Sequence, residues 1–152
     1  MEFEFNEEQR MLQKMVREFG EKEVAPGAAE RDEKDYFDRE LFDRLAALGL
    51  SGTCFPEEYG GAGSDTLSYI MSVEEISIYD DGLGVTLSAG VSLCSWPIFA
   101  FGTEEQKQKY LPRIAEGAIA AFGLTEANAG SDAAAIQTTA VKDGDYYVLN
   151  GT

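Results

Sequence analysis

The sequence contains no histidine and only two cysteines among its 152 residues. Structural and catalytic zinc sites are built mainly from histidine and cysteine, so without histidine or clustered cysteines a zinc site has no plausible ligand set. We therefore expect no metal site. Cys54 and Cys94 both lie in apolar stretches, which predicts buried free thiols rather than a disulfide. Free thiols are typical of a reducing compartment, and we expect a cytoplasmic protein.

Basic residues are also scarce, because 12 lysines and arginines stand against 28 acidic residues and leave a formal net charge of −16. Proteins that bind nucleic acids or anionic membranes need a basic surface, so the composition argues against both partners. The segment Met1–Phe5 is acidic and lacks the basic start of a secretory signal. No apolar run approaches the length of a membrane span. An anionic ligand would therefore have to bind through local backbone donors, or through basic residues outside this chain.

Helical periodicity dominates the first part of the chain. Asn6 and Gln9 match a capping box, and the helix that they open should end at Pro26–Gly27. Asp38 should cap a second helix that Gly49 closes. The side chains expected to face the core are apolar and recur at helical spacing: Met11, Leu12, Met15, Val16, Phe19, Leu41, Phe42, Leu45 and Leu48.

A further amphipathic helix is expected over residues 66–79, after a loop rich in glycine. Asp80 and Asp81 follow it. Paired carboxylates can serve acid–base chemistry, but adjacent side chains at a helix end point in different directions. We therefore interpret this pair as a solvated helix terminus.

The stretch Gly84–Ser95 has almost no charged face, which predicts a helix buried on all sides. Pro97 should end that helix. Thr103 and Gln106 match a second capping box, which opens a helix that runs to about Ile114.

After Gly117 the period changes from helix to strand. Residues 118–124, 136–141 and 146–149 are typical of strands, and Asp143–Asp145 is a hairpin turn signal. Helices followed by strands without alternation predict an α+β protein, with an all-α domain over residues 1–117 and the opening strands of a β-domain over residues 118–152. Because so few strands leave an unpaired edge, we expect the natural sequence to continue.

The segment Ala121–Asp132 is the strongest candidate for a functional site. An apolar run opens into small and polar residues, and Gly130 and Ser131 allow the backbone to come close to a ligand. Consecutive N–H groups in such a loop can bind phosphate oxygens, and the hydroxyls of Thr125 and Ser131 can donate or accept. By physics alone, an ordinary connection between two strands is the other interpretation.

Three blocks of sequence carry a family resemblance: Phe55–Gly61 (FPEEYGG), Leu124–Asp132 (LTEANAGSD) and Tyr147–Gly151 (YVLNG). In order and spacing they resemble the acyl-CoA dehydrogenases, and in particular the bacterial short-chain (butyryl-CoA) enzymes. Ala127 departs from the pattern, because the family usually has proline there. Family members also continue well past Thr152, so the chain resembles their N-terminal part only, with the β-domain being the start of a barrel-like middle domain.

The resemblance implies an FAD-dependent oxidoreductase of fatty acid β-oxidation, with an acyl-CoA substrate, an electron-transfer flavoprotein as partner and a homotetrameric assembly. The alpha carbon would lose a proton and the flavin would take a hydride from the beta carbon. The residues that the resemblance places against the flavin are Phe122, Leu124, Thr125, Gly130 and Ser131.

For the substrate, the resemblance implies that the helix over residues 84–95 lines the tunnel for the acyl chain. The residues that it implicates are Thr86, Ala89 and Leu93, together with Ser131 beside the phosphopantetheine arm. Similarity to butyryl-CoA dehydrogenases in this helix favours short chains. Glu126 is rejected as the catalytic base, because the family's glutamate comes from a C-terminal domain that nothing in this chain matches.

Two alternatives stay open. An acyl-CoA oxidase would share the chemistry and replace the flavoprotein by oxygen as electron acceptor. A catalytically silent helical interaction module could keep the family fold without the flavin.

Overall fold

The computed structural model describes residues 4–152 and divides into two compact units, Met1–Ala121 and Phe122–Thr152. The first unit is helical throughout, with two π-helical segments (η1 and η4) and two short 3₁₀ turns (η2 and η3). Its elements in chain order are α1 (Glu7–Phe19), η1 (Gly20–Val24), α2 (Ala28–Glu33), α3 (Arg39–Ala47), η2 (Leu50–Gly52), η3 (Glu57–Tyr59), α4 (Thr66–Ser77), α5 (Asp81–Ala89), η4 (Gly90–Ser95), α6 (Trp96–Phe101) and α7 (Glu104–Ala115).

Side-chain caps fix where the helices begin. The oxygen of each N-cap side chain accepts a hydrogen bond from a backbone N–H in the first turn, which satisfies a donor that has no partner inside the helix. The predicted capping boxes at Asn6 and Thr103 are both present, and Asp38 caps α3 as expected. Asp65 and Asp80 cap α4 and α5 in the same way.

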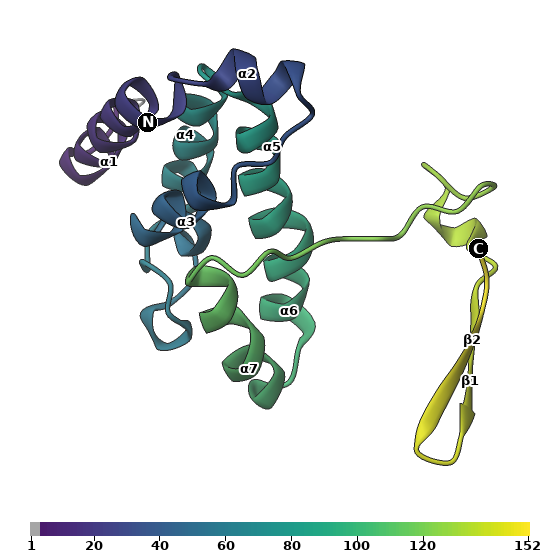
Figure 1. The fold of residues 1–152 in the computed structure, drawn as a ribbon. Helices are drawn as coiled ribbons and strands as arrows, with labels where there is room; N and C mark the ends of the chain where they lie inside the picture. The colour runs from purple at the N-terminus through teal and green to yellow at the C-terminus, as the bar shows by residue number, and fades with distance from the viewer. Residues whose placement is uncertain (1–3) are drawn as a thin grey trace. The chain divides into compact units, whose positions relative to one another are not determined.

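The core of this unit lies where α4 packs against α5 on one side and against α1 on the other (Figure 1). Two positions predicted to face it do not: Met11 is 61% exposed and Leu48 is 37% exposed. The other members of the α1 stripe, Leu12, Met15, Val16 and Phe19, do pack on the core. The core cluster consists of Val16, Val24, Leu41, Phe42, Leu45, Leu50, Phe55, Tyr69, Ile76, Leu83, Leu87 and Val91.

The segment from α5 to α6 is one continuous helical rod, Asp81–Phe101, of 21 residues (Figure 1). Pro97 does not end it, because a proline is tolerated in the first turn of α6, directly after the wider π-helical turn of η4. By length and composition alone this helix could cross a membrane, so the expectation that no apolar run approaches that length is wrong. Its core-facing side packs on α4 as the core helix of a globular unit does.

The prediction that this helix is buried on all sides is also wrong. Leu83, Leu87 and Val91 are buried, whereas Val85 is 66% exposed and Leu93 is 45% exposed. The helix therefore has one face in the core and one apolar face that unit Met1–Ala121 leaves uncovered.

The second unit is a two-stranded antiparallel hairpin preceded by the candidate loop. It contains η5 (Ala133–Ala135), β1 (Thr139–Asp143) and β2 (Tyr146–Asn150), with Thr139 opposite Asn150 and Asp143 opposite Tyr146. The predicted turn is confirmed, and Gly144 adopts a φ of 60° that favours glycine.

The strand predicted over residues 118–124 is wrong, because β1 and β2 pair only with each other and that segment has no ladder partner. The α+β organisation, helical first and then β, is confirmed.

Candidate functional site

A tight turn forms the centre of the candidate loop. The backbone N–H of Glu126 donates to the carbonyl of Ala129, and the N–H of Ala129 donates back to the carbonyl of Glu126, both at 3.1 Å. Ala129 is buried, at 2% exposure. Ala127 and Asn128 therefore occupy the tip of a closed four-residue turn.

The Glu126 side chain ties this turn to the approach of β1. Its two carboxylate oxygens accept hydrogen bonds from the backbone N–H groups of Gln137 and Thr138, each at 2.9 Å. Hydrogen bonds from the Thr138 side chain and from the backbone of both residues hold the pKa of the Glu126 carboxyl below its usual range. A carboxylate engaged in this way serves to position the loop and is a poor proton acceptor for a substrate.

The loop keeps several backbone donors free. Within residues 4–152, the N–H groups of Ala127, Asn128, Gly130 and Ser131 have no hydrogen-bond partner. A Cβ added at Gly130 would meet no atom within 4 Å, so the backbone there is open to a ligand. With the exposed hydroxyl of Ser131, this donor set suits phosphate oxygens.

The residues predicted to contact the flavin all lie in the exposed segment that begins at Phe122 and ends at Ser131. Phe122 is 50% exposed and Leu124 is 45% exposed. The structure adds residues that were not predicted from the sequence. A hollow of about 250 Å³ lies beside the turn, and it is bordered by Glu126, Ala127, Asn128, Gln137, Thr138, Gly151 and Thr152.

Gly151 closes this hollow, and only glycine fits there. A Cβ at Gly151 would overlap the side chain of Thr138. The YVLNG block that contains Gly151 was therefore a usable signal, whereas nothing local in the sequence marks Gln137 and Thr138 as partners of Glu126.

The predicted acyl-lining residues share one helix in the other unit. Thr86 and Ala89 are half-buried, and Leu93 is exposed on the uncovered side. The Thr86 hydroxyl donates to the carbonyl of Gly82 at 2.8 Å and keeps its lone pairs as acceptors. Ser131, predicted beside the same substrate, belongs to the unit Phe122–Thr152.

A π-helical turn interrupts this helix between Ala89 and Trp96. The buried hydroxyl of Ser95 donates to the carbonyl of Gly90 at 2.9 Å, and the N–H of Trp96 donates to the carbonyl of Val91. Such turns insert one extra residue and are frequent at functional sites. Leu93 therefore lies at a different angle around the helix axis, relative to Thr86, than it would in a regular α-helix. The sequence pattern did not indicate this π-helical turn.

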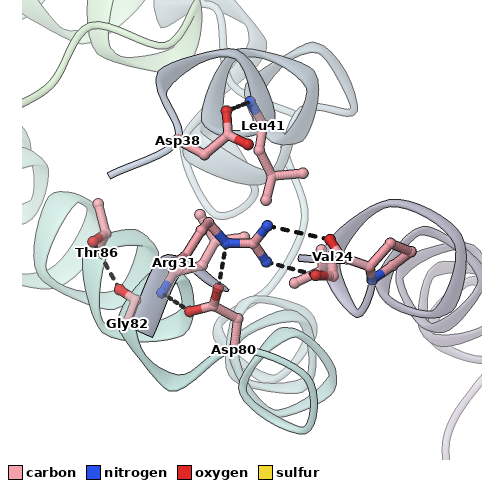
Figure 2. A network of polar contacts seen from close by, with 9 residues as sticks. Val24, Arg31, Asp38, Leu41, Asp80, Gly82 and Thr86 are labelled. Carbon is pink, nitrogen blue, oxygen red and sulfur yellow. Dashed lines mark hydrogen bonds and ion pairs between the residues drawn. The ribbon is translucent and has the colours of Figure 1, made fainter. Parts of the chain in front are cut away.

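At the start of α5, Asp80 forms a largely buried network instead of the predicted solvated terminus (Figure 2). The guanidinium Nε of Arg31 donates to the Asp80 carboxylate at 2.8 Å, with the two side chains only 11% and 14% exposed. Arg31 also donates to the carbonyls of Val24 and Pro26. The second Asp80 oxygen accepts from the N–H of Leu83, so one side chain caps α5 and anchors α2 to it.

A pocket of about 660 Å³ surrounds this network. It reaches the predicted acyl helix at Thr86. Its other borders are Ala28, Ala29, Arg31, Asp32, Asp35, Tyr36, Phe37, Asp38, Leu41, Tyr79, Asp80, Asp81, Gly82 and Leu83.

The two cysteines are free thiols, and burial raises the pKa of both. Since the thiolate is the reactive form, neither Cys54 nor Cys94 has the environment of a nucleophile. Among the described residues, no group of three metal-binding side chains comes together.

Comparison with known proteins identifies the family. Residues 6–118 match the acyl-CoA dehydrogenase N-terminal domain. The short-chain specific acyl-CoA dehydrogenase of Clostridium acetobutylicum is 52% identical over 153 residues, which cover 100% of this chain and 40% of that protein. The structure of butyryl-CoA dehydrogenase from Megasphaera elsdenii is 51% identical with a TM-score of 0.93, and the match covers 99% of this chain and 41% of that one.

A third match comes from a structural study of the electron transferring flavoprotein of Acidaminococcus fermentans and flavin-based electron bifurcation. It is 59% identical with a TM-score of 0.96, and covers 99% of this chain and 40% of that one. The chain thus spans about 40% of the length of its curated relatives. The chain belongs to the acyl-CoA dehydrogenase family, of which it contains the N-terminal helical domain and the start of the middle β-domain.

Proposed function

We propose that the full-length protein is an FAD-dependent acyl-CoA dehydrogenase that oxidises a short-chain acyl-CoA to the trans-2-enoyl-CoA. The observation that carries the proposal is the loop Leu124–Asp132. Its turn is tied to the approach of β1 by the Glu126 carboxylate, while the N–H groups of Gly130 and Ser131 stay free to bind an anionic group. Family membership and the short-chain relatives support the same conclusion.

In this proposal each loop residue has a separate task. Phe122 would lie against the flavin, and Leu124 and Thr125 would contact the polar pyrimidine edge of the ring through backbone and hydroxyl groups. Gly130 and Ser131 would hold the pyrophosphate, and Ser131 would also contact the phosphopantetheine arm of the substrate. Bound FAD would accept the hydride that leaves the beta carbon.

The proton at the alpha carbon needs a base. The bonds from Gln137 and Thr138 stabilise the charged form of Glu126 and lower its pKa, which supports a positioning role for this side chain and not the role of the base. We assign the base to a residue beyond Thr152 in the full-length protein, as the family resemblance implies.

The helix of α5 and η4 supplies the acyl site in this proposal. Ala89 and Gly90 are small, and Thr86 and Leu93 are of medium size, so bulk alone does not set the chain length. Short chains are favoured by the resemblance to the enzymes that are named for butyryl-CoA and for short-chain substrates. Each methylene that the pocket accepts or refuses changes kcat/KM by roughly 10- to 200-fold, so the preference should be graded.

The electron acceptor distinguishes the proposed acyl-CoA dehydrogenase from the alternative, an acyl-CoA oxidase. We propose an electron-transfer flavoprotein, which is supported by the related structure from the A. fermentans flavoprotein study. An oxidase would pass the electrons to oxygen instead.

The test uses the purified full-length protein under anaerobic conditions. We expect absorbance in the flavin bands, its loss on addition of butyryl-CoA, and faster reoxidation by an electron-transfer flavoprotein than by oxygen. A colourless protein would favour the silent interaction module, and rapid reoxidation by oxygen with release of peroxide would favour the oxidase. A kcat/KM optimum at roughly eight or more carbons would overturn the short-chain assignment alone.

A further inference from the structure

Ser51 carries a buried hydroxyl without a partner. It lies in η2, is 4% exposed, and its Oγ is the one buried side-chain nitrogen or oxygen within residues 4–152 that forms no hydrogen bond. Other buried hydroxyls of this unit are satisfied. Thr53 Oγ1 donates to the carbonyl of Leu50 at 3.0 Å, and Ser72 Oγ donates to that of Ser68 at 2.9 Å. Because an unpaired buried hydroxyl is unfavourable, Ser51 is expected to have a partner outside the protein chain.

The space beside Ser51 has the size of one small molecule. Ser51 borders a narrow cavity of about 10 Å³ between η2, α5, η4 and the end of α7. A cavity needs roughly 10–15 Å³ of this kind to hold a single water, so nothing larger fits without movement. Its remaining borders are Phe42, Thr86, Leu87, Gly90, Val91, Ile114, Ala118, Ile119 and Ala120.

Thr86 also borders this cavity, and it is the only other bordering residue whose side chain carries a hydroxyl. Its proton is used, because Oγ1 donates to the carbonyl of Gly82 at 2.8 Å. Its lone pairs can still accept a hydrogen bond, whereas Ser51 can both donate and accept. A molecule that is donor and acceptor at once, of the size of water, matches this pair.

We infer that the hydroxyls of Ser51 and Thr86 hold one buried water molecule in this cavity, and that the water closes the inner end of the acyl site. The second part rests on the proposed function, which places Thr86 on the acyl tunnel. An alkyl chain that reached past Thr86 would have to displace the water and leave both hydroxyls unpaired. The water thereby makes Ser51 a specificity-determining residue, although Ser51 lies on η2, outside the helix that carries the acyl-lining side chains.

The first test is independent of activity. A high-resolution crystal structure of the full-length protein should show one water within hydrogen-bond distance of Ser51 Oγ. Ser51→Ala should lower the melting temperature, because it removes a bonded hydroxyl. A Ser51 hydroxyl turned onto a main-chain carbonyl, or a Ser51→Ala protein that melts higher than the wild type, would overturn the water site.

The second test measures specificity, with Ser72→Ala as the matched control, since it removes another buried hydroxyl, in α4, that does not border the cavity. In the full-length enzyme, Ser51→Ala should raise the kcat/KM ratio of hexanoyl-CoA to butyryl-CoA by about tenfold, and Ser72→Ala should leave that ratio unchanged. Equal ratios in wild type and Ser51→Ala would overturn the specificity role. If no acyl-CoA is oxidised at all, the proposed function fails, while the water and the melting temperature still decide the first part.

Discussion

One carboxylate oxygen of Glu126 accepts a 2.9 Å hydrogen bond from the backbone N–H of Thr138, 12 residues further along the chain. The other oxygen accepts from the neighbouring residue Gln137 at the same distance. The turn at Glu126–Ala129 and the approach to β1 are therefore joined by a single side chain. The negative charge of Glu126 is thus directed toward backbone donors and away from the ligand. An acidic residue can therefore lie in a loop that is proposed to bind phosphate.

The first prediction concerns Glu126→Gln in the full-length protein. The amide offers one acceptor oxygen and turns its NH₂ group toward the second backbone N–H, so one of the two bonds is lost. We expect weaker FAD retention with turnover per bound flavin nearly unchanged. The measurement is kcat normalised to flavin content; an enzyme that keeps its FAD and loses turnover would make Glu126 the base.

The second prediction concerns pH. The folded-state pKa of Glu126 is lowered, so its stabilising contribution is complete above the ordinary glutamate value of about 4.3 and is lost as the pH falls through the lowered value. Hydrogen-exchange protection at Gln137 and Thr138 should decline in that acidic range. Glu126→Gln serves as the control and should show weak protection without this step; a wild type with constant protection would contradict the assignment.

The third prediction concerns Ala127, where the family usually has proline. Ala127 follows Glu126 in the closed turn, and its N–H has no partner within the described residues. Proline at this position of a turn fits without losing a bond, and it should stabilise the loop by about 0.4–1 kcal/mol. We expect Ala127→Pro to slow hydrogen exchange at the bonded N–H groups of Glu126 and Ala129. Asn128→Pro, at the less suitable next position, is the matched control, and slower exchange in both variants would argue against this turn geometry.

The sequence predicted what local chemistry determines. Asn6, Asp38 and Thr103 were identified as caps because a cap bonds within three residues of itself. The hairpin was predicted because Asp143–Asp145 carries its own turn signal. The loop Leu124–Asp132 was identified by its small and polar residues.

Features that depend on distant partners were missed. Asp80 was assigned to a solvated helix end, since nothing near it indicates that Arg31, 49 residues earlier, reaches its carboxylate. Residues 118–124 have strand composition but form no strand, because a strand needs a neighbour to pair with. The roles of Gln137 and Thr138 arise from a side chain 11 and 12 residues away.

The fourth prediction separates the two tasks of Asp80. Asp80→Asn keeps a good N-cap but removes the charge opposite the buried Arg31, and should destabilise the helical unit by about 3 kcal/mol. Asp80→Ala also removes the cap and should cost about 1 kcal/mol more. Denaturant unfolding of the 152-residue chain can be followed by its single tryptophan, Trp96.

The control for this pair is Asp81→Asn, since Asp81 is the exposed neighbour and should change stability by less than about 0.5 kcal/mol. If Asp80→Asn unfolds at the same denaturant concentration as Asp81→Asn, the buried ion pair contributes nothing to this unit.

The central claim is that the loop Leu124–Asp132 binds the flavin, and FAD content per chain tests it most directly. A side chain at Gly130 would hold the backbone away from the phosphates, although it meets no protein atom within 4 Å and should leave the fold intact. The account predicts about one FAD per chain in the full-length wild type and in the exposed β1 control Lys142→Ala, and a near-complete loss of FAD in Gly130→Val with unchanged helical circular dichroism. Equal FAD content in all three proteins would contradict it.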